Sequence, residues 1–323
     1  LANPSSDNNG VMTAYRFDNT REDSVSSGEA GMRWDFATGP IEHRVIASVS
    51  LFKIDSKNAY AFSDFFSPFT TDLYHPVDAV KPPADFFVGG SLNNPHKTFS
   101  TDTSSWALAD VLKFADGKVM LTLGMRDQKL KADSYDYNSG DKISSYDKSK
   151  TTPVAGIVFR PSDQWSIFAN YIEGLVAGDV APTVGPGGGT VVNAGQVQDP
   201  YQAKQFEAGV KFDAGTFGGG LSVFNIEKAS GILEALTPSD PETDYRYRAD
   251  GKARHKGVEA NVFGEPIEGL RLLAGVTLLD AQLTKTQGGF NQGKDVIGAP
   301  KTQANANVEW DLPTLKALTL EGR

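Results

Sequence analysis

Between Asp199 and Ala281 apolar and polar residues alternate, and this alternation constrains the fold more than any other feature of the chain. The run 205–212 is the clearest example, with apolar side chains at Phe206, Ala208, Val210 and Phe212. A period of two residues is typical of a β-strand with one apolar and one polar face. The stretch predicts four such strands, and their connections alternate between short and long.

The same pattern extends along the chain and predicts about thirteen strands. We expect them at 11–22, 29–37, 42–56, 98–113, 118–134, 149–160, 165–174, 199–213, 217–231, 247–263, 270–284, 299–312 and 318–323. Gly, Pro, Asp and Ser, the residues that tight turns require, mark short connections at 38–41, 114–117, 161–164, 214–216, 264–269 and 313–314. Longer connections are expected at 57–97, 135–148, 175–198, 232–246 and 285–298, and a brief one at 23–28.

This regular alternation of connection lengths predicts the fold class. In an antiparallel meander, successive connections lie at opposite ends of the sheet, so one end here is tight and the other carries long loops. Short periplasmic turns and long extracellular loops are typical of a bacterial outer-membrane barrel, whose strands cross lipid in about 9–11 residues each. We therefore predict an all-β, antiparallel transmembrane β-barrel. A soluble propeller would show a blade repeat of about 40–50 residues, which we do not find.

Composition excludes several classes of function. The net charge is -9, whereas a nucleic-acid-binding protein needs a basic surface, so no nucleic-acid partner is expected. There is no Cys, which excludes thiolate metal sites and Cys nucleophiles. The four His residues show no spacing typical of metal ligands, so neither a protein-bound metal nor a cofactor is expected.

The chain begins at Leu1 and ends inside the predicted strand 318–323. We therefore expect residues 1–323 to be part of a larger barrel, with its terminal strands and any lumen-closing domain outside this sequence. A sheet with open edges would not be tolerated in lipid, which supports that expectation.

Charged residues on the polar face of the central strands are the first candidates for function. Glu207 and Lys211 lie four residues apart on one strand, and Glu259 lies on a later one. Two interpretations are open for these residues. They line the lumen of the barrel, which we favour, or they form a paired-carboxylate enzyme site. No nucleophile or base shares a motif with them, so no catalytic residue is predicted and no enzymatic activity is expected.

The expected connection 57–97 is the most suggestive functional stretch, because unstructured loops of more than about 12–15 residues are usually functional or disordered. Its density of aromatic residues argues against disorder. Aromatic rings offer flat apolar surface with polar handles, which suits the capture of a bulky metal chelate. An alternative is that the loop packs on itself. The candidate ligand-binding residues are Tyr60, Phe62, Tyr74, His75 and Phe86.

The central stretch also resembles a known family, the TonB-dependent siderophore receptors of Gram-negative outer membranes. The residues that carry the resemblance are Tyr201–Lys211, Val223–Lys228, Gly257–Glu259, Gly264–Pro266 and Leu270–Ala281. The resemblance is strong over 150–323 and general over 1–149. It implies a 22-stranded barrel closed by a separate N-terminal plug, an arrangement found among outer-membrane transporters.

The resemblance implies a function as well. We expect a multi-pass protein of the cell outer membrane that imports a ferric siderophore and works with the TonB energy-transducing complex and outer-membrane lipid. Iron would arrive inside its chelate, so no cofactor of the protein's own is expected. Uptake of another large ligand (cobalamin, haem or a saccharide) is an alternative, as is a passive porin-like channel.

Overall fold

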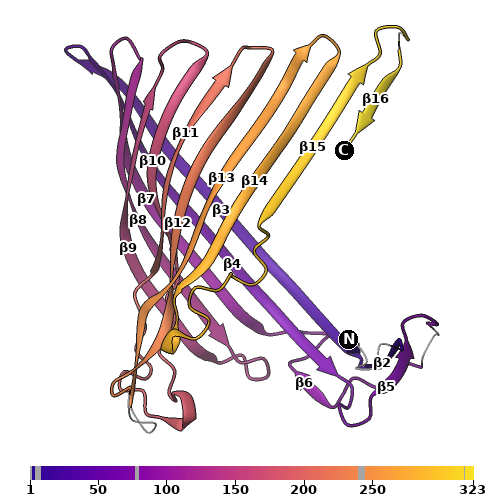
Figure 1. Cartoon of the computed structure of the whole chain (residues 1–323). Helices are drawn as coiled ribbons and strands as arrows, with labels where there is room; N and C mark the ends of the chain where they lie inside the picture. Colours follow the sequence, from indigo (N-terminus) through magenta and orange to yellow (C-terminus); the bar gives the residue numbers. More distant parts are fainter. Residues whose placement is uncertain (1, 4–8, 77–79, 239–243, 316) are drawn as a thin grey trace. The chain divides into compact units, whose positions relative to one another are not determined.

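The computed structural model describes residues 2–3, 9–76, 80–238, 244–315 and 317–323. Antiparallel strands dominate this part of the chain, and one sheet joins β16-β15-β14-β13-β12-β11-β10-β9-β8-β7-β4-β3 in that order, with β6 paired to β4 (Figure 1). The order follows the sequence, so the predicted meander is confirmed. Besides β6, the strands of this sheet are β3 (Phe17–Thr38), β4 (Ile41–Phe62), β7 (Lys97–Phe114), β8 (Val119–Tyr135), β9 (Lys142–Phe159), β10 (Trp165–Val176), β11 (Tyr201–Asp213), β12 (Phe217–Ala235), β13 (Tyr245–Ile267), β14 (Leu270–Lys285), β15 (Thr302–Asp311) and the short β16 (Thr319–Gly322).

Short elements complete the described fold. β1 (Ala2–Asn3), β2 (Val11–Ala14) and β5 (Phe69–Asp72) form a separate three-stranded sheet, and β6 spans Phe87–Gly89. Two single-turn 3-10 helices lie at Pro186–Gly188 and Gln287–Gly289. Among the described residues, no helix is long and apolar enough to cross a membrane.

The chain divides into two compact units. Unit 1 comprises Leu1–Gly28, Ser50–Ser104 and Leu130–Asp147, and unit 2 comprises Glu29–Val49, Ser105–Lys129 and Lys148–Arg323. In unit 2 the tight connections lie at one end of the strands, at 39–40, 115–118, 160–164, 214–216 and 268–269, and the longer connections 177–200 and 286–301 lie at the other end (Figure 1). Glycine occupies the left-handed region in four of these turns, with φ of +63° at Gly39, +80° at Gly117, +87° at Gly215 and +80° at Gly269.

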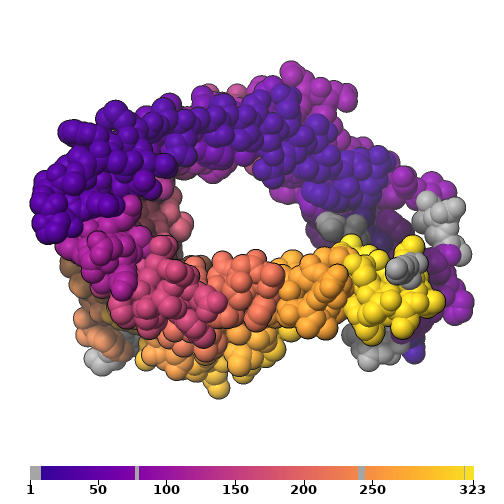
Figure 2. Space-filling model, turned by 90° about the horizontal axis from the view of Figure 1, so that it is seen from above, coloured from indigo at the N-terminus to yellow at the C-terminus, as the bar shows by residue number. Residues whose placement is uncertain are grey.

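Register places apolar and polar residues of unit 2 on opposite faces of its sheet. One row across β10 to β15 contains Ile167, Val210, Leu221, Ala260, Val276 and Ala304, each opposite the next. The neighbouring row on the other face contains Phe168, Gly209, Ser222, Glu259, Thr277 and Gln303. The strands follow one another from pink β10 to yellow β15 in Figure 2. Apolar side chains of the first face are exposed, which a membrane-facing surface requires.

The predicted turn at 23–28 is wrong. Residues 17–38 form one continuous strand, so the two predicted strands 11–22 and 29–37 merge, and 11–14 forms the separate short strand β2. Ser and Gly in 23–28 mimic a turn signal, but the segment pairs along β4. Ser56 Oγ donates to Asp23 Oδ1 at 2.6 Å, and Lys57 Nζ lies 3.2 Å from Glu22 Oε1.

The predicted loop 57–97 is also corrected at both its boundaries and its content. β4 continues to Phe62, and the connection that follows contains β5 and β6. The predicted connection 135–148 shrinks to 136–141 because β9 begins at Lys142. Both differences have the same cause. The strands are longer than a membrane crossing requires, and in their extra length polar and apolar side chains alternate less regularly. Part of the predicted connection 232–246 lies outside the described residues.

Candidate functional site

An aromatic cluster forms in unit 1 where β4 ends. Tyr60 and Phe62 lie two residues apart on β4, so both side chains project from the same face of the strand. The Phe62 ring centroid lies 5.3 Å from that of Phe65 and 6.3 Å from that of Phe87. Phe86 joins the cluster through Phe65, at 5.9 Å and nearly perpendicular. Three of the five predicted ligand-binding residues therefore lie in one cluster.

One other strand and two connections supply aromatic residues that the sequence did not single out. Phe17 of β3 packs on Phe62 with ring centroids 4.5 Å apart, and Tyr15 meets Phe65 edge to face at 5.7 Å. Tyr137, in the connection between β8 and β9, meets Tyr60 at 5.1 Å. These residues are distant in sequence from 60–87, so only the pairing of the strands brings them together.

The backbone near β6 fits closely under Tyr60. Gly89 pairs with Tyr60 across the β4–β6 ladder, and a Cβ at 89 would overlap the Tyr60 ring. The next residue, Gly90, has φ +76° and donates its N–H to Asn138 Oδ1 at 2.9 Å. Glycine therefore allows β6 to lie against the ring while the following residue joins the 136–141 connection.

The aromatic cluster is open on one side. Phe86 and Phe87 are about half exposed, at 50% and 51%, and Phe66 is 85% exposed. Exposed apolar rings are costly in water unless a ligand or partner covers them. The surface can offer flat apolar contact area together with the phenol groups of Tyr60 and Tyr137, which suits a bulky ligand with polar edges.

Tyr74 and His75, the other two predicted ligand-binding residues, have different surroundings. Tyr74 lies over Gly10, where a Cβ would meet its ring, and it belongs to the turn that follows β5. Asp72 Oδ1 accepts the backbone N–H groups of Tyr74 at 2.8 Å and His75 at 3.2 Å. These hydrogen bonds, led by that of Tyr74, hold the pKa of the Asp72 carboxyl below its ordinary value. Among the described residues, neither Tyr74 nor His75 has a ring contact with the aromatic cluster.

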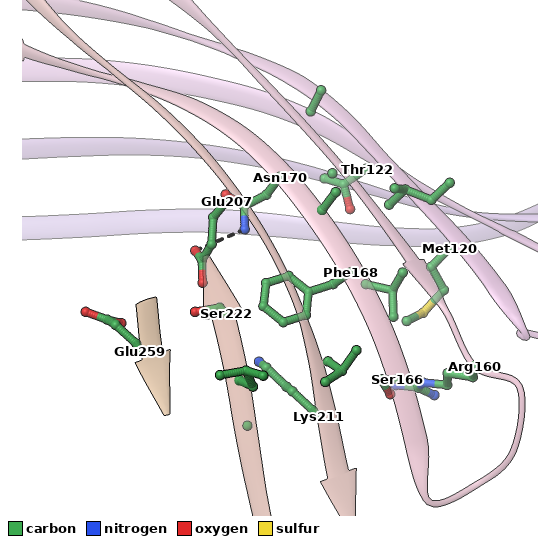
Figure 3. A pocket seen from close by; sticks show the side chains of 18 of the residues that line it. Met120, Thr122, Arg160, Ser166, Phe168, Asn170, Glu207, Lys211, Ser222 and Glu259 are labelled. Carbon is green, nitrogen blue, oxygen red and sulfur yellow. Dashed lines mark hydrogen bonds between the residues drawn. The ribbon is translucent and has the colours of Figure 1, made fainter. Parts of the chain in front are cut away.

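The polar face of unit 2 carries the three predicted lumen-lining charges. Glu207 Oε2 accepts from Asn170 Nδ2 at 3.3 Å, and Lys211 Nζ lies 5.0 Å above the Phe168 ring (Figure 3). Glu259 lies opposite Ser222 in the ladder. All three charges border one cavity of about 640 Å³, whose other polar lining residues include Thr122, Arg160, Ser166, Asn170, Ser222 and Asn261 (Figure 3).

Glu207 and Lys211 thus share a face, as their spacing predicted, but each has a different partner. The hydroxyls of Ser166 and Ser222 line the cavity beside them, and no His is among its lining residues. A mixed polar surface of this kind can contact a passing solute or another part of the protein. The predicted role of the three charges as lumen lining stays a prediction.

A second polar cluster in unit 2 was not predicted from the sequence. Asp179 Oδ2, in the connection 177–200, accepts hydrogen bonds from the hydroxyls of Tyr201 at 3.0 Å and Tyr247 at 2.8 Å. Burial raises the pKa of both phenols. Asn193 completes the attachment, because its side-chain amide accepts the Tyr247 N–H at 2.8 Å and donates to the Tyr247 carbonyl at 2.9 Å.

The space for these phenols depends on Gly231. The register of β12 against β13 shifts between the pairs Ser230–Gly251 and Ile232–Arg248, so Gly231 of β12 faces two residues of β13 and the extra residue lies in β13. A Cβ at Gly231 would overlap the Tyr247 hydroxyl. The connection 177–200 is therefore fixed to β13 by side chains that lie far apart in sequence. Across the described residues, no three His, Asp or Glu side chains are placed to hold a metal ion.

Comparison with known proteins places these features in context. Residues 2–322 match the family model described as "TonB dependent receptor-like, beta-barrel". The ferrichrome receptor FcuA of Yersinia enterocolitica is 37% identical over 300 residues, which cover 93% of this chain and 38% of FcuA. The chain thus spans less than half the length of this curated relative.

Comparison with solved structures supports the same β-barrel fold. The ferric preacinetobactin receptor BauA from Acinetobacter baumannii matches with a TM-score of 0.80 and 34% identity, over 97% of this chain and 44% of BauA. The ferripyoverdine receptor of the Pseudomonas aeruginosa outer membrane matches with a TM-score of 0.67 and 19% identity, over 98% of this chain and 40% of that receptor.

Proposed function

Because the chain belongs to the TonB-dependent receptor β-barrel family, we propose that it is part of an outer-membrane receptor that imports a ferric siderophore. The observation that carries the proposal is its 34% identity, at a TM-score of 0.80, to a ferric preacinetobactin receptor. The 37% identity to a ferrichrome receptor supports the same ligand class. Members of this family are transport receptors rather than enzymes, and the barrel makes and breaks no covalent bond.

The two faces of unit 2 support a location in the outer membrane. Exposed Val223, Phe206 and Leu278 lie on one face, and the polar residues around Glu259 lie on the other. An apolar face suits lipid, whereas the polar face suits a lumen that contacts solute and the plug domain. In this arrangement Glu207, Lys211 and Glu259 line the lumen.

The aromatic cluster is the proposed contact for the siderophore. It is exposed, it contains Tyr60, Phe62 and Phe86, and it lies at the strand ends joined by long connections. Iron enters as cargo inside its chelate, and the protein needs no metal or cofactor of its own. Movement of the bound chelate through the barrel then depends on the TonB complex, which draws on the proton gradient.

Growth on a panel of iron chelates tests this proposal. The full-length gene is deleted, and the strain is grown under iron limitation with hydroxamate, catecholate, carboxylate and haem iron sources. We expect loss of growth on one ferric siderophore, restored by the intact gene. Unchanged uptake of every siderophore would overturn the proposal, and a defect confined to haem, cobalamin or a saccharide would assign another ligand.

Energy dependence separates the receptor from a passive channel. Uptake of the identified chelate is measured in cells that lack TonB and in cells treated with a protonophore. We expect uptake to stop in both while surface binding persists. Continued uptake without TonB would indicate a porin-like channel instead.

A further inference from the structure

Carboxylates border the aromatic cluster on the connections that supply most of its rings. We call them the bordering carboxylates, and they are Asp64, Asp85, Asp136 and Asp141. The first two directly precede Phe65 and Phe86 in the chain, and the other two begin and end the connection that carries Tyr137. Among the described residues, none of the four forms an ion pair with a lysine or an arginine. Their negative charge is therefore not compensated by a cation of the fold.

Backbone hydrogen bonds fix two of the bordering carboxylates in place. Asp64 Oδ1 accepts the N–H of Phe66 at 2.8 Å. Asp136 Oδ1 accepts the N–H groups of Asn138 and Ser139, both at 2.8 Å. The hydrogen bonds from Ser139 and then Asn138 hold the pKa of the Asp136 carboxyl below its ordinary value, so this group stays ionised at neutral pH. The turns that present the rings thus position negative charge with them.

The arginine of the aromatic cluster is already engaged. Arg16 lies between Tyr15 and Phe17, and its Nε and Nη2 donate to the two oxygens of Asp18 at 3.0 and 2.7 Å. Its Nη1 donates to the Pro82 carbonyl at 3.1 Å. Arginine is the residue best suited to bind an anionic ligand through paired hydrogen bonds. Here it ties the connection after β5 to the start of β3 instead, and Asp18 balances its charge.

Lysines of β4 project away from the aromatic cluster. Successive side chains of a strand point to opposite faces, so Lys53 and Lys57 lie on the face opposite to that of Tyr60 and Phe62. Each of these ammonium groups also lies within 3.3 Å of a carboxylate oxygen. Within 63–87 and 136–141, Lys81 is the only lysine or arginine of the sequence. The rings therefore lie in surroundings with excess negative charge.

The net charge of a ferric chelate depends on the groups that bind the iron. Three hydroxamates contribute one negative charge each and leave the Fe³⁺ complex neutral, whereas three catecholates contribute two each and leave it a trianion. A trianion needs cationic donors to bind, and like charges brought together lower both affinity and the rate of encounter. Exposed rings with the phenols of Tyr60 and Tyr137 offer apolar contact and neutral hydrogen-bonding groups. This chemistry matches a neutral chelate.

We propose that the aromatic cluster takes a ferric chelate without net negative charge, of the tris-hydroxamate class, and that the bordering carboxylates exclude trianionic chelates. The inference rests on the proposed function, because it requires the aromatic cluster to contact the chelate. It adds the charge of the ligand, which the exposed rings alone do not specify. The bordering carboxylates act by repulsion through space and need not touch the iron or its ligand atoms.

Two synthetic ferric tris-hydroxamates on one tripodal scaffold serve as probes. One ends in three carboxamides and is neutral, and the other ends in three carboxylates and is a trianion. Their binding to the full-length receptor in detergent is measured by quenching of the intrinsic fluorescence of the protein. Because the two probes share the same iron-binding groups and nearly the same shape, a difference in affinity reports the effect of charge.

The test variant is D64N/D85N/D141N. Asparagine keeps an oxygen that can accept the Phe66 N–H at position 64, and Asp136 is left unchanged because two backbone groups depend on it. The matched control is D116N/D163N/D213N, which removes the same charge in and beside the tight turns of unit 2. Asp213 resembles Asp64 in its hydrogen bonding, since its Oδ1 accepts the N–H of Gly215 at 2.8 Å.

We expect the wild-type receptor to bind the neutral chelate at least about tenfold more tightly than the trianion. The test variant should narrow this preference to about threefold or less by binding the trianion more tightly, while its affinity for the neutral chelate changes less than about twofold. The control should keep the wild-type preference. Raising the salt concentration from about 50 mM to about 500 mM should also narrow the wild-type preference, because salt screens charge but does not alter shape.

Equal wild-type affinity for the two chelates would overturn the inference, as would an unchanged preference in the test variant or an equal narrowing in the control. Binding of neither chelate by a receptor that still imports a natural siderophore would overturn it as well. If the test variant loses the heat-modifiable migration of a folded barrel, D85N alone replaces it, because the Asp85 side chain has no hydrogen bond or ion pair among the described residues. A preference narrowed about twofold is then expected, and no narrowing would count against the inference.

The outcomes for the charge of the ligand and for the proposed function are distinguishable. If Phe62→Ala weakens both chelates and the wild-type receptor prefers neither, the aromatic cluster remains the contact and only the charge selectivity is removed. If the gene deletion affects uptake of no ferric siderophore on the growth panel, the proposed function itself is removed.

Discussion

Phe168 of β10 lies directly opposite Gly209 of β11, and its ring occupies the space that a side chain at 209 would need. A Cβ at Gly209 would come within 2.9 Å of the Phe168 ring and 2.5 Å of the Leu221 carbonyl oxygen. The same relationship recurs two strands away, where Phe224 lies opposite Gly257. On the polar face of unit 2, phenyl rings therefore cover glycines and shield the backbone of the neighbouring strand.

Gly209→Ala should destabilise the sheet because the new methyl group displaces the Phe168 ring and presses on the backbone of β12. We expect the free energy of unfolding to fall by about 1–3 kcal/mol, which is typical of overpacking in a well-packed region. Urea unfolding of the detergent-solubilised receptor measures it. Gly174→Ala is the control, since nothing lies within 4 Å of a Cβ there. Equal stability of the two variants would contradict the ring-over-glycine interpretation.

Tyr247→Phe should loosen the connection 177–200. The change removes one of the two phenol hydrogen bonds to Asp179, and hydrogen bonds to charged groups contribute about 1.5–3 kcal/mol. Limited proteolysis should cleave 177–200 several times faster, with unchanged cleavage in the connection between β14 and β15. Gly231→Ala should act in the same direction, because its Cβ would overlap the Tyr247 hydroxyl. Wild-type cleavage in both variants would show that the loop is held elsewhere.

Alternation made unit 2 predictable from its sequence. Strands β10 to β15 are amphipathic over the length that crosses lipid, and Gly or Pro marks their turns, so both the strand order and the sharing of one face by Glu207 and Lys211 follow from local patterns. The residues 23–28 had the composition of a turn, yet they pair along β4. Local composition cannot report a hydrogen bond such as that from Ser56 to Asp23 across 33 residues.

The candidate site was predictable only in part, for the same reason. Tyr60, Phe62 and Phe86 belong to one aromatic-rich stretch and do meet in space. Tyr74 and His75 belong to that stretch as well, but a turn anchored by Asp72 places them outside the cluster. Tyr137 meets Tyr60 across 77 positions (137 − 60), and Asp179 accepts hydrogen bonds from Tyr201 across 22 positions and from Tyr247 across 68. A single sequence gives no signal for such pairs.

Acid should weaken unit 1 through Asp133. Its hydrogen bonds, first from Lys142 and then from Ser145, place its pKa in the folded protein below the ordinary value of about 4. A lowered pKa contributes stability that is complete above the unfolded-state pKa and is lost as the pH falls through the folded-state pKa. Hydrogen exchange of 130–147 should therefore rise below about pH 4, and Asp133→Asn should flatten that dependence. A variant with the wild-type pH profile would exclude Asp133 as the cause.

A lysine introduced on the apolar face of unit 2 should impair assembly more strongly the closer it lies to the middle of the membrane. Val223 lies six residues from the start of β12, near the middle of the membrane-crossing length, so Val223→Lys should cost about 2–4 kcal/mol. Val210→Lys, three residues from the end of β11, should cost about 0–1 kcal/mol because it lies near the interface. Gln303→Lys on the polar face is the control. Heat-modifiable migration and outer-membrane yield report assembly, and equal yields for all three would mean that the faces are assigned incorrectly.

Phe62→Ala should weaken binding of the siderophore that the growth panel identifies. Phe62 is central to the aromatic cluster, with ring contacts to Tyr60, Phe65 and Phe17, so its removal takes away contact area and loosens its neighbours. We expect the dissociation constant to rise about tenfold, since one aromatic contact contributes on the order of 1 kcal/mol beyond the area it buries. Tyr74→Ala, outside the cluster, should change it less than about twofold. Fluorescence quenching by the chelate measures both variants, and urea unfolding separates lost contact from lost fold. A larger loss at Tyr74 than at Phe62 would move the ligand-binding surface from β4 to the turn after β5.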